Sequence, residues 1–374
     1  MTTLPTLRAP TLAEIRAAAE NIKSKATRTP LVRLNHERSD GAQIWLKLEN
    51  LQPVGSFKVR PAANAIECIE DKDGLRRVGV STASAGNFAQ GLAWCCAEQG
   101  ITCTVVVPDM APETKLAAIR KRGATVIKVS YSEWWEVIVT HQCPQAPAGA
   151  HFIHPGAENA VLAGNATIAL EILEELPDAD CIVVPYGSGA VCTGIACGVD
   201  ALGAAGTCRV VSAEPATAAP FALSKQRGEA SRFEAWEESF VDGCGGKAVL
   251  EEVWHLAHKY VHGGCAVPLA DIADAVRLCA ERNRIIAEGA GACPVAAALG
   301  GLGACAGARK IVCVVSGGGI DSARLCHILQ GKGVPPLGKA PSGAANAAPS
   351  WLWRGTGAAA CVGVAVALAA RARS

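Results

Sequence analysis

Lys58 is the residue whose setting most suggests chemistry. It follows an apolar run at 44–49 and the turn Gln52-Pro53-Val54-Gly55, and it stands directly after Phe57, near an expected helix start. A positive helix end and apolar neighbours push a lysine toward its neutral amine, which is the form that attacks an aldehyde. Taken alone, Lys58 would instead be interpreted as a solvated surface lysine, because most lysines are exposed.

A run of small polar residues at 81–91 lies between an apolar strand and an apolar helix. Such a turn exposes backbone N–H groups at a helix N-terminus, where a carboxylate or phosphate binds well. Ser84 or Asn87 could equally be a simple helix cap. The local sequence leaves both interpretations open.

Glycines and small residues at 187–194 follow the apolar run 181–185 and open a helix. Small residues let the backbone wrap a phosphate with its amides. Glu214 ends the next predicted strand about where a dinucleotide site would place its ribose-binding acid, so a dinucleotide-binding fold is an alternative here.

Ser316-Gly317-Gly318-Gly319 follows the apolar run 311–315. A serine at this point can hydrogen-bond a heterocycle nitrogen, and the glycines allow a ring to approach closely. The same four residues would also serve as an ordinary turn.

The elements that must position these residues alternate between short β-branched runs and alanine-rich helical stretches, which is typical of a parallel α/β fold. The predicted strands are 44–49, 79–81, 102–108, 125–129, 181–185, 209–213 and 310–315. The predicted helices are 11–25, 87–99, 114–122, one from about 192, and 271–287. All four motifs lie at ends of predicted strands, where open parallel sheets bind their ligands. We therefore expect one shared site.

Composition excludes several classes of protein. With 35 basic and 34 acidic side chains the net charge is +1, so nothing favours nucleic acid or an anionic membrane as a partner. The 17 cysteines are scattered through apolar runs without a C-x-x-C pair, which indicates buried free thiols and neither a metal centre nor a disulfide scaffold. The N-terminus lacks the features of a signal peptide, and a cytoplasmic enzyme is expected.

Together the four motifs resemble the fold type II pyridoxal-phosphate enzymes, and within them the serine/threonine dehydratase and serine racemase branch. The stretch 47–60 is similar to that family's lysine motif almost residue for residue. The resemblance implies an α/β fold of the tryptophan synthase beta type, with pyridoxal 5′-phosphate between two open parallel-sheet domains and held as a Schiff base on the catalytic Lys58. The other implied cofactor-binding residues are Phe57, Asn87, Gly187, Ser188, Gly189, Ala190, Val191, Glu288 and Ser316. The implied substrate-binding residues are Ser84, Ala85, Gly86 and Asn87.

The resemblance also implies a domain layout. Residues 1–51 and 153–334 would form a large cofactor-binding domain, 52–79 a linking segment that carries Lys58, and 80–152 a small substrate-binding domain, with the Pro-, Ala- and Gly-rich stretch 141–156 crossing between them. Residues 335–374 would be a low-complexity tail. Its apolar run 355–370 has the aromatic and basic flanks of a membrane anchor but is short and weakly hydrophobic, so we expect a dispensable appendage. A homodimer acting on a small amino acid is implied.

The expected reaction is the elimination of water from L-threonine, L-serine or a similar β-hydroxy amino acid, giving a 2-oxo acid and ammonia. Ala85 stands where family racemases carry a serine that acts on the cofactor face opposite the lysine, so racemisation is disfavoured. Glu214 matches one ligand of the family's divalent-cation site, but Pro220 stands near the second and offers none, so no metal is expected. Phe88 and Gly319 replace a common His and Asn, which bears on substrate preference. A racemase or β-replacement enzyme, or a non-catalytic cofactor-binding protein, are the alternatives.

Overall fold

The computed structural model describes residues 6–337, so nearly all of the expected tail and its apolar run lie outside the described residues. The strands are β1 (Leu31–Arg33), β2 (Gln43–Lys47), β3 (Val80–Ala83), β4 (Cys103–Pro108), β5 (Thr125–Val129), β6 (His151–Phe152), β7 (Cys181–Pro185), β8 (Arg209–Pro215), β9 (Gly263–Val267) and β10 (Lys310–Val314). The α-helices are α1 (Leu12–Ile22), α2 (Val59–Glu67), α3 (Lys72–Val78), α4 (Asn87–Ala97), α5 (Glu113–Arg120), α6 (Tyr131–Thr140), α7 (Asn159–Glu175), α8 (Ala190–Ala201), α9 (Pro220–Arg227), α10 (Glu251–Tyr260), α11 (Leu269–Leu278), α12 (Gly289–Gly300) and α13 (Ser322–Leu329). Short 3-10 turns, η1 (Glu49–Leu51) and η3 (Gly303–Cys305), and a π-helical turn, η2 (Cys279–Asn283), complete the described elements.

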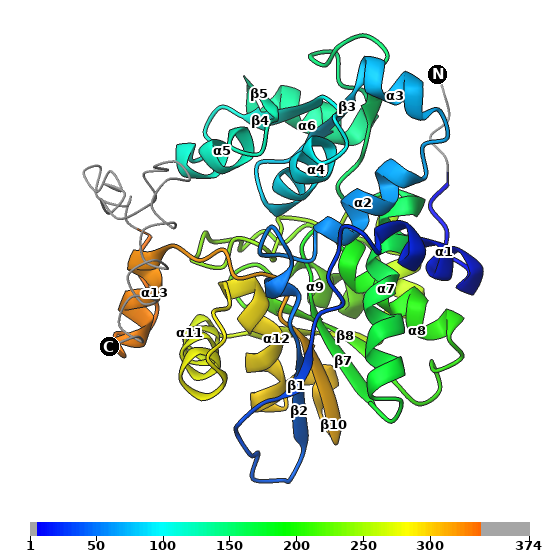
Figure 1. Cartoon of the computed structure of the whole chain (residues 1–374). Helices are drawn as coiled ribbons and strands as arrows, with labels where there is room; N and C mark the ends of the chain where they lie inside the picture. The colour runs from blue at the N-terminus through cyan, green and yellow to red at the C-terminus, as the bar shows by residue number, and fades with distance from the viewer. Residues whose placement is uncertain (1–5, 338–374) are drawn as a thin grey trace, which may run out of the picture. The chain divides into compact units, whose positions relative to one another are not determined.

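The strands form two open sheets (Figure 1). The larger has the order β1-β2-β10-β7-β8-β9 and is parallel except for the antiparallel pair β1–β2. The smaller has the order β5-β4-β3-β6 and is parallel throughout. This confirms the expected α/β fold with two open, largely parallel sheets.

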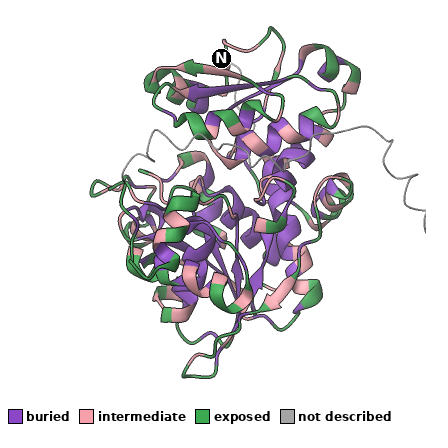
Figure 2. Cartoon of the chain, turned by 60° about the vertical axis from the view of Figure 1, so that its left-hand side comes forward, coloured by how far each residue is buried: buried purple, intermediate pink, exposed green. Residues whose placement is uncertain are grey.

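Strands of the larger sheet are apolar on both faces because helices cover both. Along β7, Ile182 and Val184 join one core cluster and Cys181 and Val183 join the other. This is the alternation that successive strand residues impose. The first cluster includes side chains of α7 and α8 and extends to Val80 and other residues of the smaller sheet, while the second includes those of α11 and α12. Buried residues thus lie mainly in the strands and on the helix faces that pack against them (Figure 2).

Two helices end earlier in the structure than the sequence predicts. The expected helix 11–25 begins after Thr11, whose side chain forms a capping box with Glu14, and ends at Ile22. The expected helix 271–287 is wrong at its C-terminal end: α11 stops at Leu278, a π-helical turn follows, and Arg284 adopts a left-handed conformation with φ 60°. Periodicity alone did not signal that break.

The expected strands are present within a few residues of their predicted limits, and 125–129 and 181–185 are matched at both ends. The crossing segment 141–156 also contains β6, which pairs with β3 in the smaller sheet. The four strands of that sheet therefore lie within 80–152, and those of the larger sheet lie outside that range. The domain limits themselves stay a prediction.

Candidate active site

Lys58 lies in the turn that leads into α2, and that turn is fixed to the glycine segment after β10. The backbone N–H of Phe57 donates to the Ser316 carbonyl at 3.0 Å, and the N–H of Gly318 donates to the Gly55 carbonyl at 3.0 Å. Ser56 forms a β-bridge with Gly317 between these bonds. Two motifs from opposite ends of the sequence are thus held together through their backbones, which leaves their side chains available.

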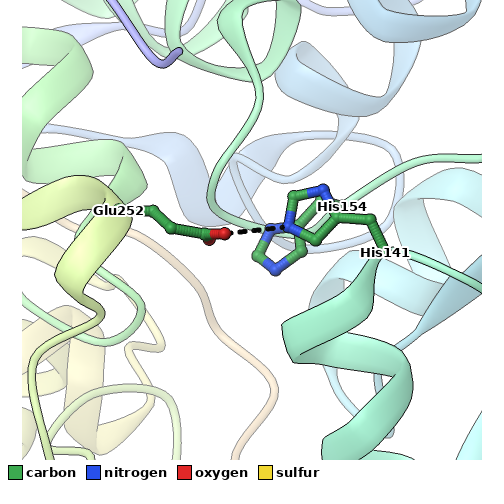
Figure 3. Close-up of side chains that lie close together, drawn as sticks. All are labelled: His141, His154 and Glu252. Carbon is green, nitrogen blue, oxygen red and sulfur yellow. Dashed lines mark ion pairs between the residues drawn. The ribbon is translucent and has the colours of Figure 1, made fainter. Parts of the chain in front are cut away.

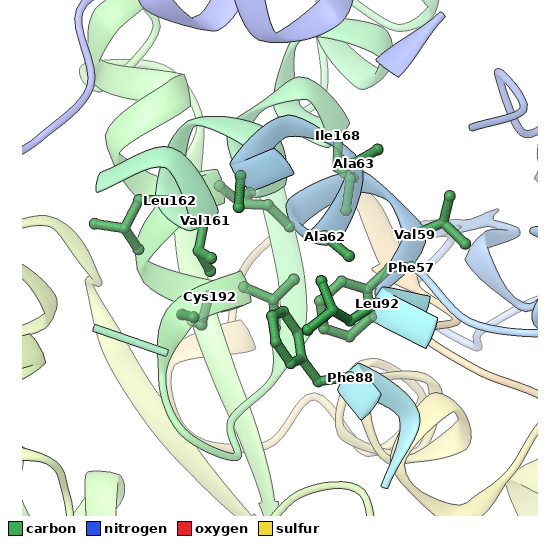
Figure 4. Packing of buried hydrophobic residues seen from close by; sticks show 14 of the residues in the cluster. Phe57, Val59, Ala62, Ala63, Phe88, Leu92, Val161, Leu162, Ile168 and Cys192 are labelled. Carbon is green, nitrogen blue, oxygen red and sulfur yellow. The ribbon is translucent and has the colours of Figure 1, made fainter. Parts of the chain in front are cut away.

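Apolar rings surround the Lys58 amine. Its Nζ atom lies 4.7 Å from the ring centre of Phe57 and 5.5 Å from that of Phe88, and both rings belong to the core shown in Figure 4. Burial lowers the pKa of Lys58 from 10.5 to about 8. A Cβ atom at Gly91 would lie 2.9 Å from the Lys58 carbonyl oxygen, so glycine there is what lets α4 pack against this turn.

The polar segment 84–87 runs into α4, whose N-cap residue is Gly86 and whose first residue is Asn87, and no side chain caps that helix. The alternative that Ser84 or Asn87 is a helix cap is therefore wrong: Asn87 Nδ2 donates instead to Glu288 Oε1 at 3.1 Å. Burial, followed by the charge of Asp242, raises the pKa of Glu288 to about 7.

The loop 187–191 forms an amide cradle at the start of α8. Gly189, the N-cap residue, has φ 89°, and a Cβ atom there would lie 2.6 Å from the Tyr186 hydroxyl. Among residues 6–337, no acceptor is within hydrogen-bond geometry of the backbone N–H groups of 187–191. Such unpaired amides at a helix N-terminus are suited to a phosphate.

Gly243 connects this cradle to the rest of the site. The carbonyl of Gly243 would be 3.1 Å from a Cβ at Gly187, and a Cβ at Gly243 would be 3.1 Å from Glu288 Oε1. The segment around Gly243 and Asp242 was not identified from the sequence. It follows no predicted strand and carries no motif, so only its packing reveals it.

Ser316 follows β10 and is buried, and within the described part of the chain its hydroxyl has no hydrogen-bond partner. Close packing needs glycine nearby: a Cβ at Gly291 would lie 2.7 Å from the Gly317 carbonyl oxygen. A Cβ at Gly319 would lie 3.2 Å from Glu288 Oε2, so this segment also contacts the Asn87–Glu288 pair.

One cluster of side chains has the composition of a metal site, namely His141, His154 and Glu252, whose potential ligand atoms lie within 4.8 Å of one another (Figure 3). However, Nδ1 of His154 accepts hydrogen bonds from the N–H groups of Gly156 and Ala157. The neutral ring therefore carries its proton on Nε2, which leaves that atom no lone pair for a metal.

Glu214, the residue that matches a family cation ligand, binds backbone N–H groups at the start of a helix. Its two carboxylate oxygens accept from the N–H groups of Phe221 and Ala222, in the first turn of α9. Burial raises the pKa of Glu214 to about 8. The expectation that the enzyme needs no metal stays a prediction.

The residues present fit pyridoxal phosphate. A desolvated amine can link an aldehyde, the unpaired amides at 187–191 can hold a phosphate, and the free Ser316 hydroxyl can face a ring nitrogen. Backbone contacts and the Gly243 segment bring Lys58, Asn87, Glu288, Ser316 and the loop 187–191 to one region. Fold and site therefore define an α/β protein whose residues are suited to a phosphorylated aldehyde cofactor.

Comparisons with known proteins agree. Residues 22–317 match the family model described as pyridoxal-phosphate dependent enzyme. The chain is 36% identical over 332 residues to an L-threonine ammonia-lyase of Thermotoga maritima, covering 88% of this chain and 80% of the relative. It is 33% identical over 318 residues to the catabolic L-threonine dehydratase of Escherichia coli K12, covering 84% and 94%. The crystal structure of serine racemase from Dictyostelium discoideum is 30% identical, with a TM-score of 0.72 over 84% of this chain and 100% of that one.

The chain belongs to the pyridoxal-phosphate dependent enzyme family, in its threonine dehydratase and serine racemase group, and its cofactor is pyridoxal phosphate. The dinucleotide-binding alternative for the loop 187–194 is thereby excluded. In the described part of the chain, no helix has the length and apolar character needed to cross a membrane.

Proposed function

We propose that this enzyme is an ammonia-lyase that converts L-threonine, L-serine or a similar β-hydroxy amino acid to the 2-oxo acid and ammonia. The observation that carries the proposal is the Lys58 amine, which lies close to the Phe57 and Phe88 rings on a turn whose backbone is hydrogen-bonded to Ser316. The threonine ammonia-lyase and dehydratase names of the similar proteins support the choice of reaction.

Each part of the site has a proposed task. The amides of 187–191 hold the cofactor phosphate, and the loop 84–87 binds the substrate carboxylate. Phe57 packs beside the cofactor, and Asn87, positioned by Glu288, faces its ring hydroxyl. When bound, pyridoxal phosphate supplies an electron sink for the charge that develops at Cα. Lys58, released as a neutral amine, takes the Cα proton.

Ser316 directs the outcome toward elimination. Its hydroxyl would face the pyridine nitrogen, and a neutral hydroxyl does not hold that nitrogen protonated as a carboxylate would. The weaker electron sink that results favours loss of the β-hydroxyl over transamination.

Racemisation is the alternative, since the structural relatives include serine racemases. It needs a second acid or base on the face opposite Lys58. Ala85, in the substrate loop, has an apolar side chain that packs against the core and cannot transfer a proton. We therefore favour elimination.

The test is a panel of L-serine, L-threonine and bulkier β-hydroxy amino acids, assayed in parallel for 2-oxo acid, ammonia and the D-enantiomer. We expect 2-oxo acid and ammonia in equal amounts, with little D-amino acid. Lys58→Ala should abolish turnover, and the matched control Lys121→Ala, at an exposed lysine, should not. Full activity of Lys58→Ala, or D-serine formed faster than pyruvate, would overturn the proposal.

By the same resemblance we propose that the enzyme works as a homodimer in the cytoplasm. Sedimentation of the purified full-length chain at micromolar concentration should give the mass of two chains. A single-chain mass across the range used for the activity assays would contradict this.

A further inference from the structure

Arg60, two residues after Lys58, is fully buried and uses every N–H group of its guanidinium. Nε and Nη2 donate to the two carboxylate oxygens of Glu49, each at 2.8 Å. Nη1 and Nη2 donate to the two oxygens of Glu171 at 2.7 and 2.8 Å. Further bonds reach Thr167 Oγ1 and the Thr27 carbonyl. A guanidinium held by two carboxylates, each through two bonds, has almost no freedom to move.

The surrounding charges balance. Glu49 is fully buried, and Lys47, also fully buried, places Nζ 2.6 Å from Glu171 Oε2. Two cations thus face two buried or nearly buried carboxylates, with the more exposed Glu175 3.9 Å from Lys47 Nζ at the edge of the network. Such pairing is the condition for keeping these groups out of water. Burial opposes ionisation of Glu49, but the charge and hydrogen bonds of Arg60 outweigh it and hold the pKa of that carboxyl below its usual range.

The four charged residues, Lys47, Glu49, Arg60 and Glu171, come from different elements: the end of β2, the turn η1, helix α2 and helix α7. Helix α2 has no side-chain N-cap, so this network is what anchors its first turn. Close packing reinforces the anchor, because a Cβ at Gly164 of α7 would lie 2.8 Å from the Arg60 carbonyl oxygen.

We infer that Arg60 is a positioning residue that sets where the Lys58 amine lies relative to the cofactor and the substrate Cα. In this role Arg60 acts only through the backbone of residues 58–60, because its guanidinium is bonded to Glu49, Glu171, Thr167 and Thr27. The inference rests on the proposed function in that Lys58 carries the cofactor and moves the proton. A displacement of about 1 Å at a reacting group can lower a rate by roughly 100-fold.

Arg60→Lys tests this directly, because lysine keeps the charge but cannot make two bonds to each of two carboxylates. We expect kcat to fall roughly 10- to 100-fold with KM changed less than about threefold, measured well below the unfolding temperature. Amide hydrogen exchange of residues 56–62 should quicken in the full-length protein. The yield of Lys58 covalently joined to pyridoxal phosphate after borohydride reduction should fall.

Two further variants keep the test decisive. Glu171→Gln loosens the same network at its least buried member and should show the same effects more weakly, even if Arg60→Lys does not fold. Arg277→Met is the matched control: Arg277 pairs with Asp274 within helix α11, at the surface and outside this network. We expect it to leave kcat and the exchange of 56–62 unchanged.

Two outcomes would overturn the inference. One is a folded Arg60→Lys or Glu171→Gln with wild-type kcat and wild-type cofactor attachment. The other is a lower unfolding temperature with unchanged kcat and unchanged exchange at 56–62, which would reduce the network to a stabilising one. Neither outcome would contradict the proposed function, which fails only if Lys58→Ala stays active or if 2-oxo acid and ammonia do not form.

Discussion

The Lys58 amine is predicted to react at neutral pH far more readily than an ordinary lysine. Its surroundings are the Phe57 and Phe88 rings at 4.7 and 5.5 Å, and burial lowers its pKa from 10.5 to about 8. A pKa of about 8 leaves about 10% of the amine neutral at pH 7, against about 0.03% for the ordinary value of 10.5. The reactive fraction is therefore raised about 300-fold.

The assay is a pulse of reductive methylation on the cofactor-free full-length protein at pH 6 to 10.5, with labelling read by peptide mass spectrometry. Exposed Lys121 in the same sample serves as the reference. Lys58 labelling should rise about tenfold per pH unit up to about 8 and then level off. The rate of pyridoxal phosphate attachment should follow the same curve, because the neutral amine attacks the aldehyde.

The result that would refute this reasoning is a Lys58 profile that keeps rising to pH 10 in parallel with Lys121. It would mean that water reaches the amine despite the two rings. In Phe88→Ser, water should reach the amine, and the midpoint of the Lys58 labelling curve should shift to higher pH than in the wild type. An unchanged midpoint in this variant would show that Phe88 does not cause the lowered pKa.

Three further predictions follow from single positions. Between pH 8 and 10.5 the Lys58 amine holds more protons in the unfolded chain than in the folded one. The free energy of unfolding of the cofactor-free protein should therefore increase with pH across that window. Chemical denaturation of Lys58→Met should lack this increase. Gly189→Ala should weaken pyridoxal phosphate binding at least roughly tenfold in equilibrium titration, because its Cβ would meet the Tyr186 hydroxyl. The control Gly228→Ala, also at positive φ but with open space around it, should bind like the wild type. Equal affinities of the two variants would contradict the assignment of the phosphate cradle to 187–191. Ala85→Ser should raise D-serine formation relative to pyruvate by adding a proton donor, and an unchanged ratio would count against the role given to Ala85.

The sequence predicted the larger pattern of the fold because strands buried on both faces leave a strong signal. Runs such as 181–185 are apolar without interruption, and both ends of that strand were predicted. The end of the helix after Asp271 was not, because the break depends on Arg284 adopting a left-handed conformation that its residue type does not announce. β6, with only His151 and Phe152, was too short to recognise.

The motifs were ambiguous locally for a related reason. Whether Lys58 is a surface lysine depends on Phe88, and whether Asn87 caps a helix depends on Glu288, and neither partner is near in sequence. Their common position at the ends of predicted strands indicated a shared site, and the resemblance to a known family indicated its cofactor. Asp242, whose charge acts on Glu288, lay in a segment without any pattern and could be found only from the folded chain.

The loop 187–191 needs glycine more at one position than at the others. It reads Gly-Ser-Gly-Ala-Val, and the demand for glycine is strongest at Gly189, with positive φ and a contact that excludes a Cβ. The Ser188 side chain is accommodated because Gly156 leaves room for it: a Cβ at Gly156 would be 3.1 Å from the Ser188 hydroxyl. In the proposed site amides, and not side chains, would bind the phosphate, so serine or alanine at the other positions would leave the binding groups in place. Substitutions that change the reaction are therefore expected in the proposed substrate loop and beside Lys58, at Ala85 and Phe88.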